Sequence, residues 1–135
     1  MTGEVIGVDT NVLVRYIVQD DLRQARLATR FMNSLTRSEP GFVSAITLTE
    51  TSWVLARKYQ ASGEDIAKAV ELLLAADVLI VEHAESVHRA LDACRRHGAG
   101  FADAFVAAIG RDAGCAETVT FDKNAAKRAG MRLLR

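Results

Sequence analysis

The segment Val5-Ile6-Gly7-Val8-Asp9-Thr10-Asn11-Val12-Leu13-Val14 begins as a short apolar run and changes character at Asp9. The run at 5–8 is rich in β-branched side chains, the pattern of a strand buried on both faces of a parallel sheet. A carboxylate at the carboxyl end of such a strand lies where open α/β sheets place their ligand crevice. Asp9 is therefore a candidate functional residue. It could equally cap the helix that follows, because aspartate is among the preferred N-cap residues.

The composition is that of an ordinary globular chain. Its 135 residues are enough for one domain, over residues 1–135, with a proper hydrophobic core. The 17 basic and 17 acidic residues balance, so any binding to a polyanion must use a local patch. Cys94 and Cys115 form no CxxC pair, which favours a reducing compartment. Because no leader-like or membrane-length apolar segment is present, we expect a cytoplasmic protein that does not bind membranes.

Segments of strand and helix character alternate along the chain. Strands are predicted at 5–8, 42–46, 78–81, 118–121 and 131–134, with helices between them. Ser62 followed by Asp65 is a helix-start signal, and Gly114 stands in the C′ position after a predicted helix over 101–113. This alternation predicts an α/β fold in which helices cover both faces of a parallel sheet.

Four acidic residues fall at the starts or ends of these elements. Asp9 ends the first strand, and Glu50 lies in the first turns of the helix after the second strand. Asp103 opens the helix after Gly98-Ala99-Gly100, and Asp122 ends the fourth strand. Strand ends and the following helix starts share one edge of a parallel sheet, so we expect the four carboxylates to converge on one pocket. Such a cluster repels itself unless it binds a cation, and all-oxygen ligands favour Mg²⁺ or Mn²⁺.

Each acid also has a purely structural interpretation. Glu50 could be a solvated acid near a helix amino terminus, Asp103 could be an N-cap residue, and Asp122 could cap the helix that starts at Lys123. The apolar neighbours in Phe101-Ala102-Asp103-Ala104-Phe105 suggest that Asp103 is partly enclosed. Enclosing an unpaired carboxylate costs several kcal/mol unless something offsets it, which favours a functional role for the set.

Four short segments, taken together and in this order, resemble the PIN-domain ribonucleases and most closely the VapC-type toxins of bacterial toxin-antitoxin pairs. They are Val8-Asp9-Thr10-Asn11-Val12-Leu13, Glu50 ahead of Trp53-Val54-Leu55, Phe101-Ala102-Asp103-Ala104, and Thr120-Phe121-Asp122-Lys123. No one segment is specific by itself. The resemblance covers essentially the whole chain.

The resemblance implies a PIN-like three-layer α/β/α sandwich with a central parallel sheet and metal-dependent hydrolysis of RNA. It carries Asp9, Glu50, Asp103 and Asp122 over as catalytic and metal-binding residues for Mg²⁺ or Mn²⁺. Thr120 falls at a hydroxyl position that supports the acidic pocket, and Asn11 at the small polar position after the first acid. Lys123 is a further candidate beside the site. Such proteins are commonly homodimers, inhibited by a VapB-like antitoxin whose carboxyl-terminal segment occupies the groove by the active site.

Two other classes of function remain as alternatives. The first is a non-catalytic RNA-binding or scaffold protein on the same fold, against which the complete acidic set argues. The second is a phospho-acceptor receiver, which would need paired acids at the first strand, whereas Asp9 stands alone. A basic carboxyl-terminal stretch could contact RNA phosphates or form a solvated helix face; it contains Lys123, Lys127, Arg128, Arg132 and Arg135.

Overall fold

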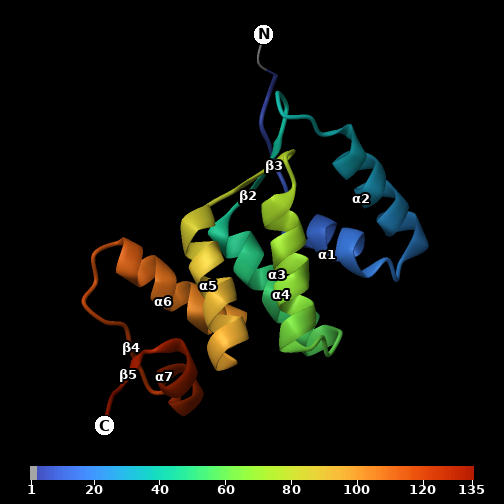
Figure 1. The fold of residues 1–135 in the computed structure, drawn as a ribbon. Coiled ribbons are helices and arrows are strands. Elements are labelled where there is room, and N and C mark those ends of the chain that lie inside the picture. Colours follow the sequence, from blue (N-terminus) through green and yellow to red (C-terminus); the bar gives the residue numbers. More distant parts are fainter. Residues whose placement is uncertain (1–2) are drawn as a thin grey trace.

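The computed structural model describes residues 3–135, and Figure 1 shows the arrangement of their helices and strands. In chain order the elements are β1 (Ile6–Gly7), α1 (Thr10–Val18), α2 (Leu22–Ser34), β2 (Gly41–Val43), α3 (Ala45–Lys58), α4 (Gly63–Ala75), β3 (Leu79–Val81), α5 (Ala84–His97), α6 (Phe101–Asp112), β4 (Val119–Thr120), α7 (Lys123–Ala129) and β5 (Arg132–Leu133). The predicted α/β class is confirmed. Among residues 3–135, no helix combines the length and apolar character needed to cross a membrane.

The first sheet contains β1, β2 and β3, in that order, with all strands parallel. Helices α1 and α2 connect β1 to β2, and α3 and α4 connect β2 to β3. Glycine suits the start of the central strand, because a Cβ on Gly41 would lie 3.0 Å from side-chain atoms of Leu35, Leu79 and Val8, which would have to shift. These side chains therefore pack closely around the start of β2.

The second sheet is small and separate. Strands β4 and β5 pair in parallel, with Val119 opposite Arg132. Figure 1 shows this sheet and α7 beyond α5 and α6, away from β1. The carboxyl-terminal unit, defined here as residues 118–135, docks there through the buried residues Ala125, Ala129 and Met131. The expectation that all strand ends share one edge is therefore wrong for β4 and β5, because packing on the helices holds them in a different place.

The environment of β1 also differs from the prediction of a strand buried on both faces. Val5 is 54% exposed and Ile6 is 43% exposed, whereas Val8 is 5% exposed. Among residues 3–135, β1 pairs only with β2, so its other edge has no neighbouring strand. The apolar run identifies a strand correctly, but its outer side is open.

Helix boundaries follow local capping chemistry. The Oγ of Ser62 accepts a hydrogen bond from the backbone N–H of Asp65 at 3.1 Å, which confirms the predicted start of α4. Gly114 adopts a φ of 92° just after α6, a left-handed conformation that glycine reaches without strain. The helices pack around a core whose most deeply buried side chains include Leu13, Val43, Leu48, Val87 and Phe105.

Candidate functional site

The first acidic group consists of Asp9, Thr10 and Glu50, at the junction of β1, α1 and α3. Asp9 occupies the N-cap position of α1, yet its side chain makes no capping hydrogen bond. The buried hydroxyl of Thr10 donates to Oε1 of Glu50 at 2.9 Å, joining residues 40 positions apart. Both carboxylates are exposed. The hydrogen bond from Thr10 fixes Glu50 beside the amino terminus of α1, one residue along the chain from Asp9.

The second acidic group consists of Asp103 and Asp122. Asp103 lies in the first turn of α6, whose N-cap residue is Gly100, so the N-cap interpretation of Asp103 is wrong. Asp122 does cap α7, because its Oδ1 accepts from the backbone N–H of Ala125 at 3.0 Å. The two side chains line one hollow of about 150 Å³ between the Gly98–Gly100 turn, α6 and α7.

Asp103 is the acid whose ionisation the fold disturbs most clearly in this hollow. Its side chain is half-buried, as the apolar neighbours predicted. Burial raises the pKa of Asp103 above its ordinary value, and the nearby negative charge of Asp122 raises the pKa further. Both effects disfavour the carboxylate form, and a cation bound between the two acids would relieve both.

The structure thus divides the four predicted acids between two places: Asp103 and Asp122 line one hollow, and Glu50 lies beside Thr10, the residue that follows Asp9. Within residues 3–135, no three acidic, histidine or cysteine side chains lie close enough to share one metal ion. The predicted pocket formed by all four acids is not present in one copy, since Asp9 follows the first sheet and Asp122 follows the second. All four are nevertheless oxygen ligands, and Mg²⁺ needs only one or two protein carboxylates when water and phosphate complete its shell. The second acidic group satisfies that smaller requirement.

None of the four acids forms a salt bridge with a residue in the described part of the chain. Other acids do pair, as Asp20 does with Arg15 and Glu71 with Arg95. Glu50 and Asp122 each accept their hydrogen bond with one carboxylate oxygen, which is Oε1 in Glu50 and Oδ1 in Asp122. The second oxygen of each carboxylate is left to bind a ligand.

Three neighbours complete the second acidic group. The Oγ1 of Thr120 accepts from the backbone N–H of Asp122 at 3.0 Å and so holds the turn that presents this acid. Arg128 lines the same hollow and donates from Nη1 to the carbonyl of His97 at 3.2 Å. Lys123 is exposed at the start of α7. Positive charge therefore lies close to the acids, on the same short helix.

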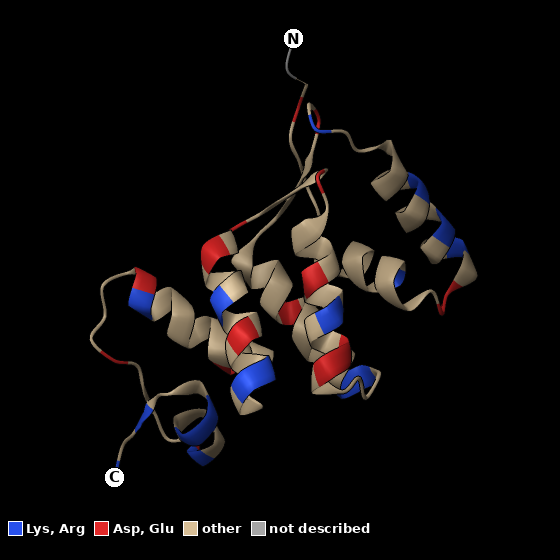
Figure 2. Ribbon diagram, in the orientation of Figure 1, with Lys and Arg blue, Asp and Glu red and all other residues tan. Residues whose placement is uncertain are grey.

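Basic residues lie on several helices, as Figure 2 shows, and two sets of them form no salt bridges within residues 3–135. One set is on α7, and the other is on α2, with Arg23, Arg26 and Arg30 exposed. Not every basic residue of the carboxyl-terminal stretch is available to bind an anion, because Arg132 forms a salt bridge with Glu117 at 2.7 Å. Both sets are placed to contact a polyanion locally despite the zero net charge.

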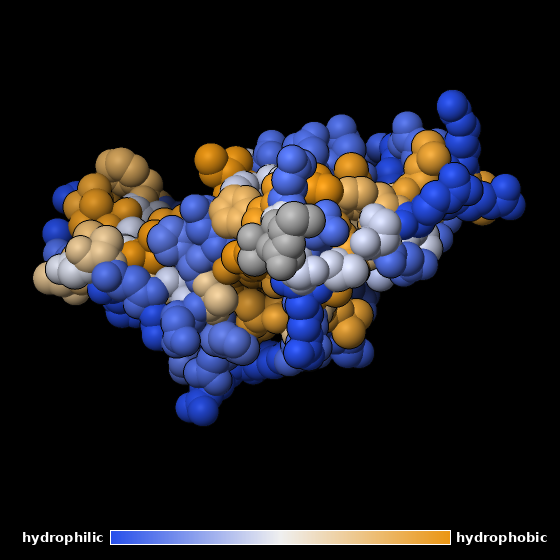
Figure 3. All heavy atoms as spheres, turned by 90° about the horizontal axis from the view of Figure 1, so that it is seen from above, coloured by the Kyte–Doolittle hydropathy of each residue, from blue (hydrophilic) through white to orange (hydrophobic). Residues whose placement is uncertain are grey.

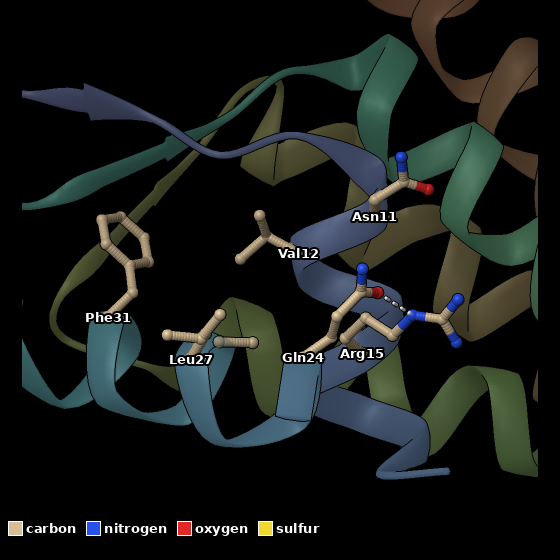
Figure 4. Close-up of a pocket in the computed structure, with 7 residues that line it drawn as sticks. Asn11, Val12, Arg15, Gln24, Leu27 and Phe31 are labelled. Atoms are coloured by element: carbon tan, nitrogen blue, oxygen red, sulfur yellow. Dashed lines mark hydrogen bonds between the residues drawn. The ribbon is translucent and has the colours of Figure 1, made fainter. Parts of the chain in front are cut away.

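Asn11 lies apart from the second acidic group. It lines a cavity of about 270 Å³ between α1 and α2, shown in Figure 4. Val12, Leu27 and Phe31 give this cavity an apolar lining, and Arg15 donates from Nε to Oε1 of Gln24 at 2.7 Å within it. Asn11, the first residue of this lining in chain order, follows Asp9 by two positions.

Comparison with known proteins identifies the family of this chain. The model of the PIN domain family matches residues 6–131, almost the whole sequence. The chain belongs to the PIN domain family, which confirms the family predicted from the sequence. No curated protein matches the chain significantly. Among solved structures, Mycobacterium tuberculosis VapC20, described as a toxin that cleaves the sarcin-ricin loop, matches with 25% identity over 96% of this chain and 98% of that chain, at a TM-score of 0.46.

Two residues of the site are not predictable from their places in the sequence. Thr10 lies in the first motif, but its hydrogen-bond partner is 40 positions away. Arg128 lies in a basic stretch, and the carbonyl of His97 that it contacts is also distant in sequence. A hydroxyl residue directly after the first acid is the signal in the sequence that points to Thr10.

Proposed function

We propose that this protein is an endoribonuclease that depends on Mg²⁺ or Mn²⁺ and acts as the toxin of a toxin-antitoxin pair. The observation that carries the proposal is the second acidic group: a half-buried Asp103 whose pKa is raised by burial and by Asp122. Two neighbouring acids that form no salt bridge repel each other, and a bound cation would relieve this repulsion. Membership of the PIN family and the resemblance of the four motifs to VapC-type toxins support the same activity.

The chemistry proposed for the residues follows from the resemblance of the four motifs, and it requires the two acidic groups to lie closer together than they do in the described residues. Asp9 and Asp103 would be ligands, direct or through water, of the principal ion, and Glu50 and Asp122 would hold a second ion or orient the attacking water. A bound divalent ion lowers the pKa of its water and stabilises the leaving oxygen of a phosphodiester. Thr10 and Thr120 hold Glu50 and the Asp122 turn in place through their hydroxyls. Hydrolysis by this route leaves a 5′-phosphate and a 3′-hydroxyl.

The substrate interface is assigned to the basic residues beside the acids. Arg128 and Lys123 lie on α7 with Asp122, so RNA phosphates held by them would pass next to the second acidic group. Phosphate contacts of this kind position a strand without reading its sequence. We assign the activity to one PIN-like domain over residues 1–135, acting as a homodimer in the cytoplasm.

The test is cleavage of a mixed pool of structured RNA by purified protein with Mg²⁺ or Mn²⁺. An EDTA control, the Asp9→Asn variant and the Asp103→Asn variant are run beside the wild type. Asp77→Asn is the matched control, because Asp77 is an exposed acid in a surface pair with Arg37, away from the acidic groups. Cutting that requires metal, Asp9 and Asp103 but not Asp77 supports the proposal. Binding of RNA without cutting, by folded protein, would favour the non-catalytic RNA-binding alternative.

The antitoxin is assigned to the cavity between α1 and α2. Its apolar lining by Leu27 and Phe31, with Arg15 and Gln24 at its polar side, suits an amphipathic segment of a partner protein. Co-expression with the adjacent small open reading frame should give a stable complex that no longer cleaves RNA. Leu27→Glu should weaken that complex, because Leu27 is 52% exposed and free to contact a partner. Recovery of an active toxin from the co-expressing cells would contradict this assignment.

A further inference from the structure

A second hollow, termed the basic hollow, adjoins the one lined by Asp103 and Asp122. It has a volume of about 300 Å³ and lies between α5, the end of α6 and α7. Arg128 and Ala129 line both hollows, so the two lie side by side on α7. The charged and polar residues of its lining are Arg89, Asp92 and His97 on α5, Arg111 on α6 and Arg128 on α7.

Positive charge predominates in the basic hollow. Three arginines line it against one acid, Asp92. That acid is already paired, because its Oδ1 accepts from Nε of Arg96 at 2.9 Å. Of the arginines, Arg111 and Arg128 form no salt bridge within residues 3–135. Charges of one sign that face a common hollow repel each other, and a bound anion would relieve this repulsion.

The fold holds two of these guanidinium groups in place. Arg128 donates from Nη1 to the carbonyl of His97 at 3.2 Å. The same nitrogen packs against the turn at Gly98, where a Cβ would lie 3.0 Å from it and where the φ of 69° also suits glycine. Nearer the start of α5, Arg89 is held by a salt bridge with Asp112. The basic hollow therefore offers an anion donors that are already ordered, which reduces the entropy lost on binding.

The lining of the basic hollow suits a phosphate backbone better than a protein segment. Besides its charged residues and His97, the lining consists of Ala93, Ala129 and Gly130. Protein partners are anchored mainly by large apolar or aromatic contacts, whereas a phosphate backbone needs only positive charge and hydrogen-bond donors. The apolar surface lies in other places. Figure 3 looks onto the end of the molecule where β1 begins and shows apolar surface there, with a second apolar area at the left, over the carboxyl-terminal side.

The length of the basic hollow favours a strand over a single small anion. From Arg89 to His97, both of which line the hollow, α5 rises by roughly 12 Å. One phosphate group can reach only one end of that distance, whereas successive phosphates of an extended strand can reach both.

We propose that the basic hollow binds phosphates of the RNA strand beyond the bond that is cut, so that the strand runs from the second acidic group past Arg128 to Arg111 and Arg89. The inference rests on the proposed function and adds a substrate subsite to it. Arg128, which lines both hollows, marks the step from the cut bond to the first phosphate held. Uncut phosphates bound in this way position the strand, and efficient cleavage then requires an RNA long enough to reach them.

The first experiment measures RNA binding without cleavage. Fluorescence anisotropy of a labelled single-stranded RNA is recorded in EDTA at several salt concentrations. Arg111→Gln should weaken binding by about fivefold. It should also make the slope of log K against log salt shallower by about 0.7, because one phosphate contact is lost. Asp92→Asn removes the acid of the lining and should tighten binding, a gain that a misfolded protein would not show.

The matched control is Arg95→Gln. Arg95 lies on α5 like Arg89, but it pairs with Glu71 at 2.8 Å and does not line the basic hollow, so RNA binding should stay unchanged. The basic hollow needs no metal to bind phosphate, so binding by the wild type should persist in EDTA. Absence of that binding, or equal binding by the wild type, Arg111→Gln and Asp92→Asn, would overturn the inference.

A second experiment locates the phosphate that is held. Single-stranded substrates with one uncharged methylphosphonate, placed at successive positions on either side of the cut bond, are compared by their KM for cleavage. We expect the wild type to be sensitive on one side of the cut, and Arg111→Gln to lose that sensitivity at one position, because it no longer contacts that phosphate. Equal sensitivity of both proteins at every position would overturn the inference and leave the proposed function intact. RNA binding that follows the first experiment, without cleavage in Mg²⁺ or Mn²⁺, would contradict only the proposed function.

Discussion

Replacing Thr10 by valine tests whether the Thr10 hydroxyl holds the carboxylate of Glu50 in place. Thr10 is 8% exposed, and its hydroxyl donates to Oε1 of Glu50 at 2.9 Å. Valine has nearly the same shape, so the substitution removes the hydrogen bond without leaving a cavity. Hydrogen bonds to charged groups contribute about 1.5–3 kcal/mol, but Glu50 is exposed and water replaces the donor, so we expect a loss of about 1 kcal/mol. For a chain of this size, that loss lowers Tm by about 3–4 °C.

The effect on cleavage should exceed the effect on stability. Without the hydroxyl, Glu50 is free to leave its position, and loss of such a supporting contact typically lowers activity by about tenfold or more. The assay is kcat/KM for RNA cleavage together with thermal denaturation, with Thr10→Ser expected to restore both values. Thr51→Val is the matched control. Thr51, on α3, is buried like Thr10, but its hydroxyl donates to the backbone carbonyl of Thr47 at 2.8 Å and not to an acid. If Thr10→Val loses no more activity than Thr51→Val, Thr10 does not position Glu50.

Three further predictions concern charge, metal and a helix cap. In metal-free protein, Asp103→Asn should be more stable than the wild type near neutral pH, because a raised pKa means that the folded state disfavours the carboxylate. Urea titrations should show this advantage shrinking as pH falls through the raised pKa toward the ordinary value of 3.8, where the wild-type acid also becomes protonated. At free Mg²⁺ about 100 times its Kd, linkage should stabilise the wild type by about 2.7 kcal/mol in thermal melts, and a similar rise in Asp103→Asn would exclude this acid as a ligand. Ser62→Ala should cost about 1 kcal/mol through the lost cap of α4, with kcat/KM for cleavage unchanged.

Local chemistry made much of the molecule predictable. Side-chain periodicity located the helices, and short-range signals at Ser62 and Gly114 located two of their ends, because capping acts within a few residues. The order of the four motifs along the chain was enough to predict the protein family. The half-burial of Asp103 was also foreseeable, since apolar residues stand on both sides of it in the sequence.

Long-range pairing was not predictable in the same way. The run at 5–8 is apolar, but apolarity does not say which strand, if any, covers its outer edge, and Val5 and Ile6 are exposed. Strands of two residues, such as β4 and β5, carry too little pattern to specify their partners, so packing of Ala125, Ala129 and Met131 decides where they lie. The hydrogen bond between Thr10 and Glu50 likewise depends on how α1 meets α3.

The division of the strands between two sheets bears on how the protein behaves in concentrated solution. Among residues 3–135, β1 and β4 each leave one edge without a neighbouring strand, and Val5, Ile6, Val119 and Phe121 beside these edges are exposed. Unpaired backbone groups next to apolar side chains favour pairing with any other extended chain, so a lysine placed at either edge should raise the concentration at which the protein precipitates.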